Sequence, residues 1–175
     1  MSKKFLIGVM IFLIIVVSML LQINFLNETT LWGVSANIAI VMIVGIGLMS
    51  GTTPGILVGA AYGIFFDILS RKKHRSIYSE CIYCFGYSSG IFSRGFSKEN
   101  KFSLIYMTAL YTAIIELLIY GMFIIIYGYE FEIIIIAKKI ILEAAYNMIL
   151  SRLLFKPIAS LGEIINKSKQ SYYML

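Results

Sequence analysis

Four polar residues recur at every fourth position within the largely apolar segment 133–155, which also contains Lys138 and Arg152: Lys139, Glu143, Asn147 and Ser151. Residues four apart lie on one face of an α-helix, so this spacing predicts a polar stripe. Lys139 and Glu143 can form an ion pair along such a helix, which offsets much of the cost of placing them away from water. Asn147 can then hydrogen-bond to a neighbouring helix and fix its register.

A further glutamate, Glu116, is the only charged residue of the apolar segment 104–127. A charge inside a membrane requires a partner, so we expect Glu116 to meet a lysine or arginine of another helix, or the polar stripe of the last one. Such a set of residues can form an ionisable pathway, as in transporters, or an internal structural network. A coupled pathway normally uses more ionisable positions, so we favour a structural network of Glu116, Lys139, Glu143 and Asn147.

Glycine also recurs at every fourth position, at Gly47, Gly51, Gly55, Gly59 and Gly63. Small residues at this spacing let two helix backbones approach closely in a membrane. Pro54 divides the series, so Gly55, Gly59 and Gly63 belong to one helix. They predict either packing between helices of this chain or a docking groove for a partner's helix, and we favour the first.

The next step of four leads from the glycines to Asp67. The simplest interpretation of Asp67 is a carboxylate at a helix end that pairs with Arg71, four residues further on. The alternative is a proton-binding or partner-binding contact.

Sequence signatures of catalysis are absent, since there is no H-E-x-x-H motif, no P-loop and no G-x-S-x-G motif. Cys81 and Cys84 form a C-x-x-C pair, but a zinc site generally needs four ligands and only His74 lies near them. We therefore interpret the two thiols as small buried hydrophobes. The prediction is a protein that is not an enzyme and binds no metal or cofactor.

The composition of the chain is that of a membrane protein. Its 175 residues are 59% hydrophobic, with a net charge of +6. Most basic residues flank apolar runs, as expected beside anionic lipid headgroups, which argues against nucleic acid as a partner. No segment between the apolar runs reaches the ~50 residues of a typical soluble domain.

About 20 apolar residues are needed to cross a bilayer. The predicted fold is all-α and polytopic: a bundle of about six transmembrane helices over residues 1–155, then a short cytoplasmic tail over 156–175. The expected spans are 5–23, 36–49, 54–69, 77–92, 104–127 and 133–155. The middle three are short and rich in glycine, so partial re-entry into the membrane is an alternative.

Basic residues near the helix ends favour an N-terminus and a C-terminus that are both cytoplasmic. That side collects Lys3, Lys4, Arg94, Lys98, Lys101, Arg152, Lys156, Lys167 and Lys169. The first loop on the other side, 24–35, contains no lysine or arginine. The basic segment 71–75 disagrees with this orientation, and a single crossing by residues 36–69 would instead give five spans.

Six short motifs follow one another along the chain: Val-Ser-Ala-Asn-Ile at 34–38, Leu-Met-Ser-Gly at 48–51, the glycine segment 55–69, Phe-Gly-Tyr-Ser-Ser-Gly at 85–90, Ile-Glu-Leu-Leu-Ile-Tyr at 115–120 and Glu-Ala-Ala-Tyr-Asn at 143–147. Their order and spacing resemble the bacterial rod shape-determining protein MreD family. One departure is the basic segment 71–75, where members of that family usually have a small glycine-containing loop.

The resemblance implies a six-helix, non-enzymatic scaffold in the bacterial cytoplasmic (inner) membrane that regulates peptidoglycan synthesis during cell elongation. The implied partners are an MreC-like bitopic protein and, beside it, MreB, RodA and a penicillin-binding protein. The helical arrangement of the family is also similar to the substrate-binding subunits of energy-coupling-factor vitamin transporters, which gives the alternative function. Trp32 and its polar neighbours are candidates for such a ligand cavity. The bulky first helix argues against this alternative, because those subunits use small residues there to meet the coupling subunit.

Overall fold

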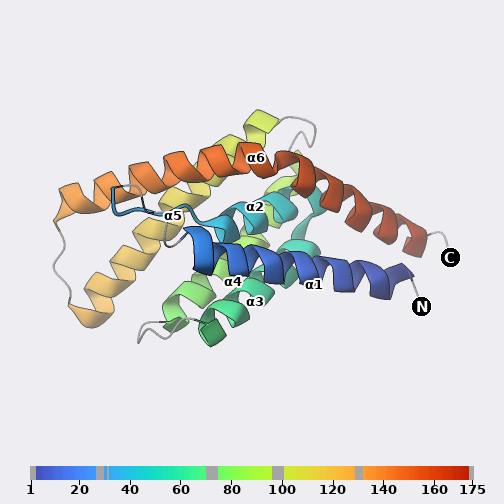
Figure 1. Cartoon of the computed structure of the whole chain (residues 1–175), viewed down its shortest axis with the longest axis horizontal. Helices are drawn as coiled ribbons and strands as arrows, with labels where there is room; N and C mark the ends of the chain where they lie inside the picture. The colour runs from blue at the N-terminus through green and yellow to red at the C-terminus, as the bar shows by residue number, and fades with distance from the viewer. Residues whose placement is uncertain are drawn as a thin grey trace.

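The computed structural model describes residues 3–26, 30, 32–69, 75–95, 101–128 and 132–173, and within these ranges the chain is all-helical. The α-helices are α1 (Lys3–Leu21), α2 (Ile38–Ser50), α3 (Thr52–Leu69), α4 (Arg75–Phe92), α5 (Lys101–Tyr127) and α6 (Ile133–Tyr173). A π-helical turn, η1 (Gln22–Leu26), extends α1, and a 3-10 turn, η2 (Ser93–Gly95), follows α4. The two termini lie at the same end of the molecule (Figure 1).

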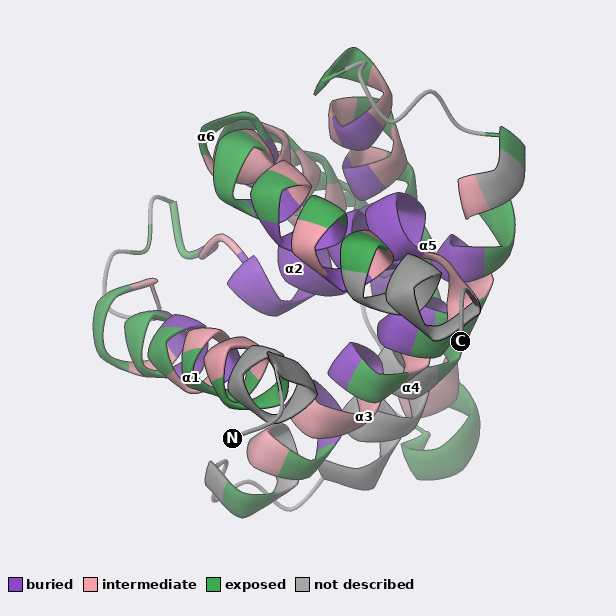
Figure 2. Ribbon diagram, turned by 90° about the vertical axis from the view of Figure 1, so that its right-hand side faces the viewer, coloured by how far each residue is buried: buried purple, intermediate pink, exposed green. Residues whose placement is uncertain are grey.

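The centre of the molecule is α2, and all of its residues from Ile38 to Ser50 are buried. It packs against α3, α4, α5 and α6, and Figure 2 shows it as a buried helix among its neighbours. A helix that is apolar all round is typically enclosed by protein or lipid. At 1.5 Å per residue, α2 is only about 20 Å long. Both of its ends therefore lie among the surrounding helices, where their polar backbone groups need partners.

The distribution of apolar and polar side chains differs from that in a soluble domain, because the surface is apolar and the largely apolar interior also holds polar residues. Large apolar side chains are exposed on α1, α3, α5 and α6, among them Phe12, Leu13, Leu57, Ile64, Ile68, Leu117, Ile141 and Leu153. The interior holds Thr108, Thr112, Glu116, Glu143, Asn147 and Ser151. In soluble proteins, glutamate is rarely buried and large apolar patches are rarely exposed.

Two helical segments, Gly8–Leu26 and Lys101–Tyr127, are long and apolar enough to cross a membrane. Two shorter helical segments, Ile38–Ser50 and Thr52–Phe65, are also apolar. Because the described residues form helices and no strands, the prediction of an all-α fold is confirmed for them.

The last helix does not end at residue 155, where the predicted cytoplasmic tail begins. Helix α6 continues without interruption to Tyr173, with Pro157 inside it. Ile158, Leu161 and Ile165 are buried on the core because they recur at helical spacing on one face. The first part of the expected tail therefore completes the packing around α2.

Candidate functional site

The buried charge of α5 is paired with α6. The Nζ atom of Lys139 lies 2.9 Å from Oε2 of Glu116, and the Glu116 side chain is only 2% exposed whereas that of Lys139 is 38% exposed. The same ammonium group lies 5.0 Å from the centre of the Tyr120 ring. This contact provides the partner that Glu116 was expected to need. It also corrects the expected pairing of Lys139 with Glu143, since the ion pair joins two helices instead of running along α6.

Glu143, one helical turn after Lys139, is 4% exposed. It lies on the same face of α6 as Lys139 and Asn147, because the three residues are four apart. The predicted polar stripe is therefore turned towards the interior at Glu143 and Asn147.

Asn147 is fully buried and joins three helices. Its Nδ2 atom donates to Thr112 Oγ1 on α5 at 3.0 Å, and its Oδ1 atom accepts from the backbone N–H of Asn37 at 2.7 Å. Thr112 in turn donates to the carbonyl oxygen of Thr108 at 2.8 Å. The side chain of Asn147 thus connects α6 to α5 and to the residue that precedes α2.

Gln22 of η1 also holds the start of α2 through its side-chain amide. Its Oε1 atom accepts from the N–H of Ile38 at 2.8 Å, and its Nε2 atom donates to the carbonyl oxygen of Ala36 at 3.0 Å. Asn37 itself caps α2 by accepting from the N–H of Ile40 at 3.4 Å. The first N–H groups of a helix have no partner within the helix, and leaving them unpaired inside a protein is costly.

The side chains of Gln22, Asn37, Thr112 and Asn147 therefore form a polar network around the start of α2, and Glu116 and Lys139 form a separate ion pair between α5 and α6. Sequence reasoning found Glu116, Lys139, Glu143 and Asn147, and missed Gln22, Asn37 and Thr112. Two signals were available: Gln22 is a polar residue at the end of a long apolar run, and Asn37 is a preferred N-cap type directly before an apolar helix.

The glycines of α3 pack against α4. A Cβ atom on Gly55 would overlap the carbonyl oxygen of Gly86, and one on Gly86 would overlap that of Gly55. A Cβ atom on Gly86 would also lie 3.4 Å from the Cα atom of Gly59. One turn further along α4, a Cβ atom on Gly90 would lie 2.6 Å from the backbone nitrogen of Thr52. The space beside the α3 glycines is therefore filled by a helix of the same chain.

Gly63, Asp67 and Arg71 are the other predicted positions of this region. Gly63 is buried on α3. Asp67 lies near the end of the same helix, but its side chain and the whole of Arg71 are outside the described residues. The expected Asp67–Arg71 pair therefore stays a prediction.

Comparison with protein-family models, with curated proteins and with solved structures finds no match. The resemblance to MreD thus rests on the motifs of the sequence.

The prediction of two buried thiols is wrong for Cys84. Cys84 is a free, exposed thiol and not a buried one. Cys81, as a side chain, and His74 lie outside the described residues. Across the described ranges, no group of three or more His, Cys, Asp or Glu residues is arranged to hold a metal ion.

Proposed function

We propose that this protein is a non-enzymatic scaffold whose six helices cross the bacterial cytoplasmic membrane and which holds an MreC-like bitopic partner within the cell-elongation machinery. The observation that carries the proposal is the combination of an apolar exterior with a polar network that fastens the central helix. Lipid favours that combination, and a soluble protein would bury the apolar side chains instead.

Membrane insertion is supported by the dimensions and arrangement of the helices. Helix α5 has 27 residues, which makes it about 40 Å long and sufficient for the ~30 Å hydrocarbon core. Helix α6 carries more charge, but Glu143 and Asn147 face the interior and Lys139 is neutralised by Glu116. Termini at one end of the molecule agree with an even number of spans and with the cytoplasmic placement of both.

A scaffold role is supported by how the polar groups are used. Within the described residues, the side chains of Gln22 and Asn147 are occupied by hydrogen bonds that hold the start of α2. Glu116 and Lys139 neutralise each other. Groups committed in this way contribute to a fixed arrangement of helices, which is what a docking platform requires.

The partner's helix needs a surface that this chain does not itself cover. On α3, Leu57, Ile64 and Ile68 are 65%, 61% and 69% exposed. At 100° per residue, they form a stripe on the side of α3 opposite Gly55 and Gly59. We propose this stripe as the contact for an MreC-like helix, in place of the glycine face.

The proposal is tested by placing a photo-crosslinking amino acid at Leu57 or Ile64 in cells that depend on the protein. We expect crosslinks to the MreC-like partner from both positions, and none from the matched control position Ile43, which is 1% exposed. Depletion of the protein should also widen the cells. Cells of normal width together with no trapped member of the elongation machinery would refute the scaffold role.

A further inference from the structure

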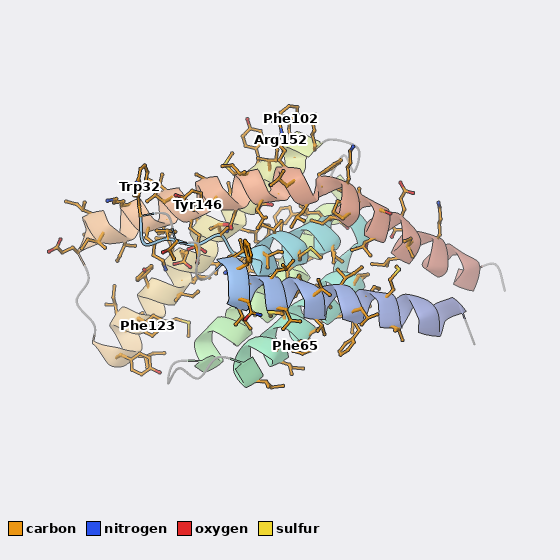
Figure 3. The ribbon with its side chains drawn as sticks, viewed as in Figure 1. Trp32, Phe65, Phe102, Phe123, Tyr146 and Arg152 are labelled. Atoms are coloured by element: carbon orange, nitrogen blue, oxygen red, sulfur yellow. The ribbon has the colours of Figure 1, made fainter. Side chains whose placement is uncertain are left out.

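Hollows follow one another along a single face of α6. The α6 residues that line them recur at intervals of three or four, for example Ile135, Lys139, Leu142 and Tyr146. Two of these hollows lie along the first half of the helix, and their volumes are, in chain order along α6, about 440 Å³ and 560 Å³. We call them the head hollow, which begins at Ile134, and the tail hollow, which extends to Leu153. In Figure 3, Trp32, which lines the head hollow, lies beside this half of α6, and Tyr146, which lines the tail hollow, belongs to it.

The head hollow has a positively charged lining. Lys138 and Lys139 both border it, together with Trp32 and apolar residues of α6. Because Lys139 is paired with Glu116, Lys138 supplies the positive charge. No carboxylate of the described residues lines it, and both Glu116 of α5 and Glu143 of α6 are buried. Trp32 is 80% exposed at its edge. Lysine ammonium groups attract phosphate, and tryptophan is enriched where protein meets the headgroup region.

The tail hollow is apolar. Leu26 and Ala36 border it from the segment between α1 and α2, and Ile149, Leu150 and Leu153 border it from α6. From Lys139 to Leu150 the helix rises about 16 Å at 1.5 Å per residue. That distance matches half of the ~30 Å hydrocarbon core, which is the depth of one leaflet.

We infer that the two hollows together bind an anionic phospholipid, with its phosphate beside Lys138 and an acyl chain in the tail hollow. Charge complementarity selects an anionic headgroup. The apolar tail hollow, which extends from the head hollow to about one leaflet's depth, selects a lipid over a small soluble anion, which would leave the tail hollow unfilled. The inference rests on the membrane insertion in the proposed function and is independent of the scaffold role.

Trp32 makes the inference directly testable, since it is the only tryptophan of the chain. The protein is reconstituted into vesicles in which an increasing fraction of the lipid is phosphatidylglycerol brominated near the head of its acyl chains. Bromine quenches tryptophan fluorescence at short range, so the quenching curve reports how often such a lipid lies beside Trp32. A parallel series uses brominated phosphatidylcholine, which has no net charge.

We expect phosphatidylglycerol to be preferred over phosphatidylcholine, and Lys138→Gln to reduce that preference about fivefold, the effect of one lysine near a charged lipid surface. The matched control is Lys167→Gln, because Lys167 is exposed on the same helix and pairs with Glu163 far from both hollows. This variant should keep the full preference. Soluble glycerol phosphate should leave the quenching unchanged.

Two results would overturn the inference. One is equal quenching by the two lipids, or a preference that Lys138→Gln leaves intact. The other is release of the quenching by glycerol phosphate, which would identify the site as one for a soluble phosphate. Flotation of the vesicles on a density gradient keeps the two proposals apart: a protein that fails to float refutes membrane insertion, and one that floats without lipid preference refutes the lipid site alone.

Discussion

The contact between α3 and α4 is made of backbone, whereas that between α5 and α6 depends on polar side chains. At the first, Gly55 and Gly86 bring two main chains together with no side chain between them. At the second, Glu116 meets Lys139 and Thr112 meets Asn147. In lipid, burial of apolar surface contributes little to helix association, so close packing and hydrogen bonding have to hold the helices together. This chain uses one device in each helix pair.

The two devices should fail differently. A backbone contact tolerates no added atom on the facing side, and no neighbouring side chain can compensate for one. A polar contact loses one bond at a time, and its cost depends on which group is left unpaired. Four substitutions, from the largest expected effect to the smallest, test this difference.

Gly86→Val should have the largest effect. Its side chain would overlap the carbonyl oxygen of Gly55, so α3 and α4 must separate. We expect a loss of about 3 kcal/mol or more, at or above the upper end for overpacked sites. Unfolding by denaturant in detergent micelles measures it. The control is Gly121→Val on α5, where an added Cβ atom meets nothing within 4 Å. Equal losses for the two variants would show that the backbone contact does not hold the pair.

Lys139→Met should come next, because it leaves Glu116 buried without its cation. Removing one partner of a fully buried pair costs about 3–5 kcal/mol, and we expect about 2–3 kcal/mol because Lys139 is partly exposed. The same unfolding measurement applies. The double variant Glu116→Gln with Lys139→Met should recover much of the loss, and no recovery would argue against the pair.

Asn147→Ala should cost about 2 kcal/mol, since it leaves the N–H of Asn37 unpaired inside the protein. We expect the loss to appear first as faster amide hydrogen exchange in the first turn of α2, which Asn147 holds. Unchanged exchange at Ile38 and Ala39 would show that Asn147 does not secure the start of α2.

Thr112→Val should have the smallest effect, about 0.6 kcal/mol, the average for a hydrogen bond between membrane helices. It removes the bond from Asn147 Nδ2 but leaves the bond to the backbone of Asn37 in place. Combined with Asn147→Ala, it should add almost nothing further. Full additivity would mean that the two side chains do not interact.

The sequence was informative about which residues needed partners. The isolated Glu116 and the stripe from Lys139 to Asn147 were recognisable as a buried set because charges and amides are costly in apolar surroundings. The spacing of Gly55 and Gly59 likewise indicated a close helix contact. The counterpart glycines, Gly86 and Gly90, carry the same four-residue spacing and were overlooked.

The sequence was less informative about who the partners are. Lys139 is equally placed by spacing to pair with Glu143, and only the approach of α5 brings Glu116 to it. The backbone N–H of Asn37 lies 110 positions from Asn147, and no spacing rule connects them. The continuation of α6 beyond residue 155 depends on the core that its apolar residues cover.

By itself, the sequence determined that the chain forms apolar helices and which faces of them have to be covered, because helix formation and its periodicity depend on residues four apart. The tertiary structure alone decided which helix covers which face: α4 lies on the glycines of α3, and Asn147 holds the start of α2. Such choices depend on how each helix is rotated and on where it crosses its neighbour, and these are set by contacts between residues far apart in the chain.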